Sequence, residues 1–293
     1  MERGPPEVAD YDGEEECPSG RTTPIARKVE RQPLVLGFHR PGSRVELEGP
    51  ALRVIVEGRA AVYFPLRRVS RIVAGPSAEF RTEAILACAQ QGVVIVWQDA
   101  SRGLVARTVG RTNARSGMRQ AVIDLLLDPD AQPRYQAWLL ETEKRIASLV
   151  GRQIEAPSEL AVYPDRLRAW IGQAGAFFSG EAAERETRGH FETLAAAWMT
   201  EHLLHQGLDG ECEAWQSDEL DLGKDLTQLF ALRLEPSRLS WLRRRHQWAT
   251  ATGRAPRPVR LETAALIWER SEPRISSAGR VLAHSLYRWL VPV

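Results

Sequence analysis

The sequence predicts an α+β protein in which a small β-rich region precedes a larger all-helical region. Alternating and β-branched apolar segments occupy residues 34–109, and apolar residues at helical spacing dominate after about residue 110. The chain has 293 residues, 43% hydrophobic and 26% charged, which is enough to bury a sizeable core without disulfides. Its apolar runs all fall short of the roughly 20 residues that a bilayer-spanning helix needs, which argues against a membrane protein.

The β-rich region is predicted over residues 32–109. Residues 52–57 alternate before Gly58-Arg59, which is typical of a strand entering a two-residue hairpin, and the chain returns as AAVYF. RVSRIVAG is a further strand, and the nearly continuous apolar run GVVIVWQD is typical of a strand covered on both faces. Between them we expect a short helix with Thr82 as N-cap and Gly92 at its end. RGLVARTV is expected to be the last strand.

Residues 110–293 are predicted to be helical. A helix of about four turns is expected from Pro133 to Gly151, and apolar residues between Phe191 and Leu203 form one buried stripe. LSWLRRRHQW, ETAALIWER and GRVLAHSLYRWL are predicted as three further helical segments. Residues 1–31, rich in proline, glycine and glutamate, are predicted to be a disordered acidic tail.

A net charge of +1 conceals strong segregation of charge. Residues 101–119 contain five arginines and no acid, whereas residues 206–225 contain seven acids and one lysine. Arginine is a strong ligand for phosphate oxygens, so nucleic acid is a candidate partner, with solvated helix faces as the alternative. The three cysteines, Cys17, Cys88 and Cys212, have no CxxC spacing and no secretory signal before them, which predicts reduced thiols in the cytoplasm.

Two stretches are similar to a known family. Residues 64–107, FPLRRVSRIVAGPSAEFRTEAILACAQQGVVIVWQDASRGLVAR, resemble the N-terminal domain of the CRISPR adaptation integrase. LHQGLDG followed by ELDLGKDLTQLFALRLEP resembles the helix-loop-helix around that family's catalytic centre, so the resemblance covers residues 34 to about 245. It implies a DNA endonuclease and integrase that dimerises through its β-rich domain, binds DNA with single-stranded ends and uses Mg²⁺ or Mn²⁺ held by glutamate, histidine and aspartate.

The family's ligand positions carry other residues in this chain. Matching the motifs places Ile171 at the glutamate position, Trp215 at the histidine position and Gln228 at the second acidic position, which leaves Asp225 as the residual catalytic and metal-binding residue. Isoleucine and tryptophan offer no lone pair to a hard cation, so we expect no metal or only weakly bound Mg²⁺ or Mn²⁺. If the count slips, Asp218 or Asp221 takes the place of Asp225.

Three other groups of residues are candidates to replace the missing metal ligands. The acids between Asp209 and Asp221 either rebuild a metal site with different ligands or form a solvated loop. Glu181, Glu184 and Glu186 follow Ile171 by ten or more residues, which on one continuous helix would separate them from it by more than ~15 Å. His202 and His205 have the spacing of half a metal site, although His202 lies on the buried stripe and is expected to be a core residue.

Seven arginines are the candidate DNA contacts: Arg107, Arg111, Arg115, Arg119, Arg243, Arg244 and Arg245. The first four recur every four residues and would share one face of a helix. The last three lie between Trp241 and Trp248, an arrangement suited to unstacked bases, although tryptophans at helical spacing can equally belong to a core.

The favoured hypothesis is a catalytically degenerate CRISPR adaptation integrase that forms a homodimer and binds DNA. The resemblance implies, as further partners, the small CRISPR adaptation subunit and an active integrase paralogue or another nuclease. Two alternatives stay open: an active metal-dependent endonuclease or integrase with rearranged carboxylate ligands, and a heterodimerising scaffold that does not bind DNA.

Overall fold

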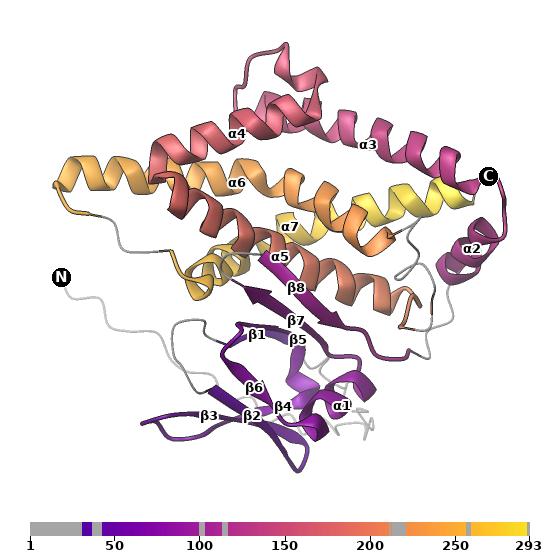
Figure 1. The fold of residues 1–293 in the computed structure, drawn as a ribbon, viewed down its shortest axis with the longest axis vertical. Helices are drawn as coiled ribbons and strands as arrows, with labels where there is room; N and C mark the ends of the chain where they lie inside the picture. Colours follow the sequence, from indigo (N-terminus) through magenta and orange to yellow (C-terminus); the bar gives the residue numbers. More distant parts are fainter. Residues whose placement is uncertain are drawn as a thin grey trace, which may run out of the picture.

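The computed structural model describes residues 31–36, 43–99, 103–112, 117–210, 212, 221–255 and 259–291. The predicted acidic tail therefore lies almost wholly outside the described residues, as do Arg115, Trp215 and Asp218. Within the described part, two four-stranded sheets precede an array of long helices (Figure 1), so the predicted α+β class is confirmed. No helix in this part of the chain is long and apolar enough to span a bilayer.

The outer sheet has the order β4-β3-β2-β6, with β2 and β3 antiparallel and a short parallel pairing of β2 with β6. Its strands are β2 (Ser43–Glu48), β3 (Ala51–Val56), β4 (Val62–Pro65) and β6 (Ala78–Phe80). The predicted two-residue hairpin at Gly58-Arg59 is wrong in length, because residues 57–61 connect β3 to β4. Gly58 does adopt the positive φ of 74° that the turn requires.

The inner sheet has the order β1-β5-β7-β8 and is parallel except for its last pair. Its strands are β1 (Gln32–Leu36), β5 (Val69–Ala74), β7 (Val94–Asp99) and β8 (Gly103–Thr108). Alternate residues of β7 face opposite sides: Val94 and Val96 join the helical core, and Ile95 joins the core between the sheets. The prediction that β7 is covered on both faces is therefore confirmed.

The short helix α1 (Thr82–Gln90) packs against β2 and β7 and completes the core between the sheets with Ala84 and Cys88. Arg81, not Thr82, occupies its N-cap position, and no side chain caps the helix there. Gly92 follows the helix with φ of 68°, as expected for a glycine that ends a helix.

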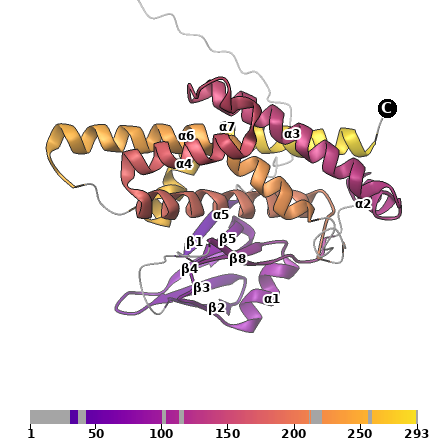
Figure 2. The same ribbon diagram turned by 45° about the horizontal axis from the view of Figure 1, so that its top comes forward.

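Helix α5 lies across the other face of the inner sheet and contacts β5, β7 and β8 (Figure 2). Helices α4, α6 and α7 pack on α5, whereas α3 packs on α4 and α6, and α2 packs on α7. Two short 3₁₀ helices cover Leu66–Arg68 and Leu160–Val162. The helices are α2 (Gly117–Leu126), α3 (Ala131–Gln153), α4 (Pro164–Ser179), α5 (Glu181–His205), α6 (Leu222–Thr252) and α7 (Leu261–Leu290).

The expected helices of residues 133–151 and 191–203 are present within α3 and α5. ETAALIWER and GRVLAHSLYRWL, predicted as separate segments, belong to the single helix α7, which continues through Pro273. One core contains residues of both the inner sheet and the helices, for example Val73 and Val96 with Phe191 and Trp198. The division into domains at residues 109 and 110 stays a prediction, and the change from strands to helices falls between Thr108 and Gly117.

Candidate nucleic-acid interface

Asp225, the acid that the sequence matches to the family's metal centre, lies in the first turn of α6. Tyr135 of α3 donates a hydrogen bond from its Oη to Asp225 Oδ2 at 2.9 Å. Burial raises the pKa of Asp225, and the bond from Tyr135 opposes that rise. Burial and the neighbouring Asp225 carboxylate also raise the pKa of Tyr135. The carboxylate therefore accepts from a neutral phenol that will not lose its proton at physiological pH.

Ile171 packs against a part of α6 that follows the turn carrying Asp225. It is 1% exposed and belongs to a small apolar core with Leu167, Leu232 and Leu239. The last two lie about two and four helical turns along α6 from Asp225. Gln228 is exposed, and Trp215 lies outside the described residues. No group of three or more His, Cys, Asp or Glu among the described residues is arranged to hold a metal ion, and the assignment of these positions to the family's metal ligands stays a prediction.

The arginines of residues 107–119 do not share a helix face, because Arg107 lies in β8, Arg111 in a loop and Arg119 in α2. Arg107 Nη2 contacts Asp221 Oδ1 at 3.3 Å, and Arg119 Nη1 donates to Asp209 Oδ1 at 2.9 Å. Asp221 Oδ1 also accepts from the backbone amide of Lys224 and so caps α6. Arg107 therefore links β8 to the start of α6, and Arg119 links α2 to the segment that follows α5.

Asp209, one of the acids expected in a solvated loop or a rebuilt metal site, is 3% exposed. Its other oxygen accepts from the backbone amide of Thr112 at 3.3 Å. Both carboxylate oxygens therefore serve internal contacts with the junction between strands and helices, and the solvated-loop alternative is wrong for this residue.

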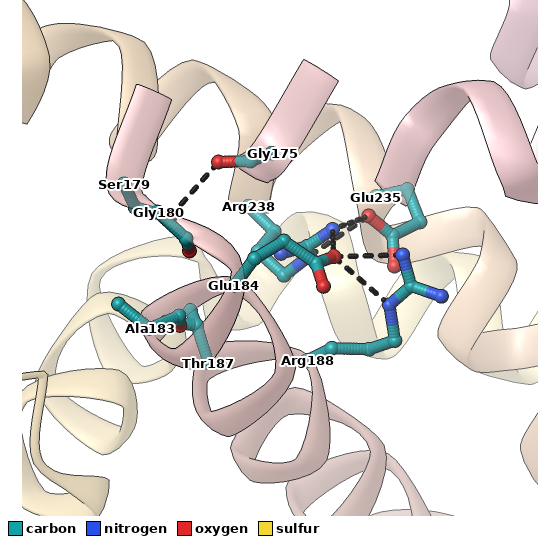
Figure 3. Close-up of polar contacts among 9 residues, drawn as sticks. All are labelled: Gly175, Ser179, Gly180, Ala183, Glu184, Thr187, Arg188, Glu235 and Arg238. Atoms are coloured by element: carbon teal, nitrogen blue, oxygen red, sulfur yellow. Dashed lines mark hydrogen bonds and ion pairs between the residues drawn. The ribbon is translucent and has the colours of Figure 1, made fainter. Parts of the chain in front are cut away.

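A buried network of ion pairs joins α5 and α6 beneath α4, as Figure 3 shows. Arg238 is fully buried, donates from Nε to Glu235 Oε2 at 2.8 Å, and reaches Glu184 Oε1 from Nη2 at 3.1 Å. Arg188 donates to the same Glu184 oxygen from Nη2 at 2.7 Å. The four charges balance in pairs, which is the condition under which charged groups can be buried.

The position of Glu184 corrects the distance expected from the sequence. Helix α4 ends at Ser179, and the chain reverses at Gly180, whose φ is 83°. Glu184 therefore packs back against α4, where a Cβ on Gly175 would lie 2.7 Å from its Cγ. The distance expected from the sequence assumed one continuous helix, whereas two helices meet at Gly180. Glu184 lies against α4, where its carboxylate pairs with Arg188 and Arg238.

Exposed aromatic and basic side chains gather where the C-terminal ends of α4 and α6 lie together. Phe177 is 73% exposed and Trp248 is 50% exposed, and the rings of Phe177 and His246 lie 5.7 Å apart. The guanidinium of Arg245 lies 5.7 Å from the centre of the Trp241 ring. Arg243 and Arg244 are exposed on the same stretch of α6. We call Phe177, Phe178, Trp241, Arg243, Arg244, Arg245, His246 and Trp248 the aromatic-arginine surface.

The sequence located the arginine part of this surface but not its phenylalanines. His246 Nδ1 lies 3.2 Å from the carbonyl oxygen of Phe178, which ties α6 to the end of α4. Sixty-eight residues separate the two partners, so no local pattern could have joined them. Trp248 is half exposed and therefore not a core residue, whereas its role in stacking on bases stays a prediction.

Comparisons with known proteins agree with this architecture. Residues 36–162 match the family model described as CRISPR associated protein Cas1. A solved Cas1 protein from Thermotoga maritima has 10% sequence identity and a TM-score of 0.63, over 89% of this chain and 97% of that chain. No curated protein sequence matches the chain.

Two further solved structures show the same fold. The complex of TtCas1 with DNA has 14% identity and a TM-score of 0.50, over 88% of this chain and 90% of that one. A casposase bound to its integration product has 12% identity and a TM-score of 0.51, over 86% of this chain and 82% of that one. The family model over residues 36–162 and the shared fold confirm the resemblance to the CRISPR adaptation integrase that the sequence indicates.

Proposed function

We propose that this protein binds DNA carrying single-stranded ends, that its inherited metal centre is degenerate, and that it acts in the cytoplasm together with a catalytically active partner. The aromatic-arginine surface is the observation that carries the DNA-binding part. Exposed rings offer faces on which unstacked bases of any sequence can stack, and guanidinium groups beside them neutralise phosphates. That one solved structure of this fold is a DNA complex and another holds an integration product supports the same conclusion.

The chemistry of the inherited positions supports degeneracy. The glutamate position is filled by Ile171 within an apolar core, and Asp225 is held by Tyr135. A hard divalent cation needs several oxygen ligands converging on one point, which these described residues do not supply. Strand cutting and joining would then be carried out by an active integrase paralogue or another nuclease, with the small CRISPR adaptation subunit bridging dimers.

The outer sheet supports a homodimer through the β-rich region. Val62 of β4 is 52% exposed and Leu47 of β2 is 37% exposed, and the strand register places both side chains on the same face of the sheet. Apolar side chains gathered on one sheet are a common feature of self-association surfaces. Sedimentation velocity of the full chain and of Val62→Glu tests this, and an unchanged oligomeric state in the variant contradicts a dimer through this sheet.

DNA binding is tested by fluorescence anisotropy with a duplex that has single-stranded ends. In Trp248→Ala we expect about a tenfold loss of affinity, because stacking on one aromatic side chain contributes ~1–3 kcal/mol. In Arg243→Ala/Arg244→Ala the slope of log K against log salt should fall by about one to two units. The matched control is Arg67→Ala/Arg68→Ala, two exposed neighbouring arginines of the β-rich region. Equal losses in the control and the test variant would contradict the assignment of this surface.

The two alternatives give different results in the same preparation. Cleavage of branched DNA with Mn²⁺ that disappears in Asp225→Ala would establish an active enzyme with rearranged carboxylates. Absence of any DNA complex at low salt would establish a scaffold without DNA binding. Salt-dependent binding without metal-dependent turnover is the result that our proposal predicts.

A further inference from the structure

A pocket lies between α2, the C-terminal end of α5 and α7, away from the aromatic-arginine surface. Helix α5 starts at Glu181 beside the end of α4, and its pocket residue His202 lies about 30 Å from that start along the helix axis. The pocket volume is about 400 Å³. It is lined by Gly117, Met118, His202, Gln206, Arg280, Ala283, His284 and Tyr287.

The lining residues carry basic groups and no carboxylate. Arg280, His284 and Tyr287 follow one another at offsets of four and three, so they lie on one face of α7. His202 contributes its imidazole from α5, opposite that face. Within the described part of the chain, no hydrogen bond or ion pair engages the Arg280 guanidinium. The fork of this arginine is therefore available to a ligand.

The His202 imidazole is positioned by a rigid support. It stacks on Trp198 with ring centres 4.9 Å apart and planes 12° from parallel. Trp198 donates from its indole nitrogen to Ser276 Oγ at 3.1 Å and packs so closely on Gly279 that a Cβ there would lie 2.3 Å from the ring. Since Gly279 immediately precedes Arg280, the same contact sets the place of both basic side chains. This corrects the expectation of a core histidine, because His202 is half-buried and lines a pocket.

The electrostatics of the pocket favour an anion. Burial lowers the pKa of His202, and the charges of His205 and Arg280 lower it further. Glu201 is the carboxylate that acts in the opposite direction, and its Oε2 is already bound by Arg71 at 2.7 Å. The positive charges around the imidazole are thus poorly compensated, and a bound anion would relieve them.

The α2 helix adds a further feature. It begins at Gly117, which lines the pocket, and the first backbone amides of a helix attract negative charge. A Cβ on Gly117 would lie 2.8 Å from the Tyr287 hydroxyl, so a larger residue at this position would require the Tyr287 side chain to shift. An arginine fork, two imidazoles, a phenol and a helix start are donors suited to a tetrahedral oxyanion.

We propose that this pocket binds a phosphate group, presented either by the end of a DNA strand or by a free nucleotide. Because the pocket lies away from the aromatic-arginine surface, the proposal goes beyond the function proposed above. Binding of inorganic phosphate is measured without DNA. A protein that binds DNA but not phosphate would contradict only the pocket proposal, and a protein that binds phosphate but not DNA would contradict only the proposed function.

The first experiment titrates full-length protein with inorganic phosphate, followed by ³¹P NMR. We expect binding in the wild type and at least about a tenfold loss in Arg280→Gln/His284→Gln, because charged hydrogen bonds are removed. Arg274→Gln, an exposed arginine of the same helix outside the pocket, is the matched control and should bind as the wild type does. The substituted side chains are exposed, so folding is expected to persist, and circular dichroism checks it. Equal phosphate binding in all three proteins, or no binding in the wild type, would overturn the proposal.

The second experiment separates the two sources of phosphate. Oligonucleotides with a 5′ phosphate, a 3′ phosphate or hydroxyl ends are compared by anisotropy, and ATP is used as a competitor. A preference for one phosphorylated end that Arg280→Gln/His284→Gln abolishes assigns the pocket to a strand end. Displacement of inorganic phosphate by ATP with no end preference assigns it to a nucleotide. If neither ligand distinguishes the wild type from the variant, the pocket is not a phosphate site.

A pH series provides an independent readout. Sulfate keeps its charge between pH 6 and pH 8, so any change in its affinity reports on the protein. A bound anion favours the protonated imidazole of His202, and we therefore expect sulfate to bind more tightly at pH 6. The pH dependence should weaken in His202→Gln, and an unchanged dependence would contradict the role of this side chain.

Discussion

Replacing Arg238 by methionine removes a fully buried positive charge while keeping a flexible apolar stem of similar length. In the wild type this guanidinium binds both Glu235 and Glu184. Glu184 would keep Arg188 as a partner, whereas Glu235 would lose the only ion-pair partner it has among the described residues. The variant therefore confines a carboxylate without a counter-charge between α5 and α6.

The size of the effect follows from burial. The side chains of Glu184 and Glu235 are 7% and 11% exposed, so water cannot replace the lost guanidinium. Removing one partner of a buried ion pair costs about 3–5 kcal/mol, and we expect a loss of this size in the free energy of unfolding for Arg238→Met. The double variant Arg238→Met/Glu235→Leu buries no unpaired charge, so it should recover most of that loss.

Urea unfolding followed by tryptophan fluorescence measures both effects. The control is Arg44→Met, which removes an exposed ion pair with Glu79 and should cost less than about 1 kcal/mol. The argument is refuted if Arg238→Met unfolds at the same urea concentration as Arg44→Met. It is equally refuted if the double variant is less stable than Arg238→Met, because the network would then matter through packing and not through charge.

Three further predictions follow from single sites. Burial raises the pKa of Asp225, so the folded state holds this proton more strongly than the unfolded state and Asp225 disfavours folding above its ordinary pKa. The stability of Asp225→Asn relative to wild type, measured by urea unfolding, should therefore rise with pH from 4 to 6, and a flat difference would contradict the raised pKa. Gly279→Ala forces a methyl group against Trp198 and should cost about 1–3 kcal/mol in thermal unfolding, whereas Ser277→Ala on the exposed side of α7 should cost little. Burial raises the pKa of Cys88 to about 12, so iodoacetamide at pH 8 should modify this thiol, read by mass spectrometry, only after unfolding; rapid labelling of the native protein would be inconsistent with its burial.

Local patterns predicted most of the elements because burial imposes a regular period on each of them. The continuous apolar run of β7 reflects a strand with a core on each side, and the stripe from Phe191 to Leu203 reflects the face that α5 buries. The lengths of loops and the ends of helices were harder to predict from the sequence. Nothing local indicates that the hairpin after β3 needs five residues, or that α7 continues through Pro273.

Spacing was an unreliable guide to the candidate sites. The regular interval of Arg107, Arg111, Arg115 and Arg119 is that of a helix, but the chain there leaves a strand and crosses a loop before α2 begins. Ion pairing with Asp221 and Asp209 then gives two of these arginines an internal role. The sequence shows that an arginine can bind a phosphate. Only the fold shows whether an acidic side chain of the same protein already pairs with that arginine.

The amino-acid sequence was sufficient to predict the α+β class, the resemblance to the Cas1 family and the side chains at the positions matched to that family's metal ligands. These depend on the order of the residues and on side-chain chemistry. Tertiary structure alone decided which of those residues meet. The reversal at Gly180 brings Glu184 against α4, the junction of α4 and α6 joins Phe177 to His246, and α7 sets Arg280 opposite His202. Contacts between residues far apart in the chain depend on how whole helices pack, and no local periodicity encodes that packing.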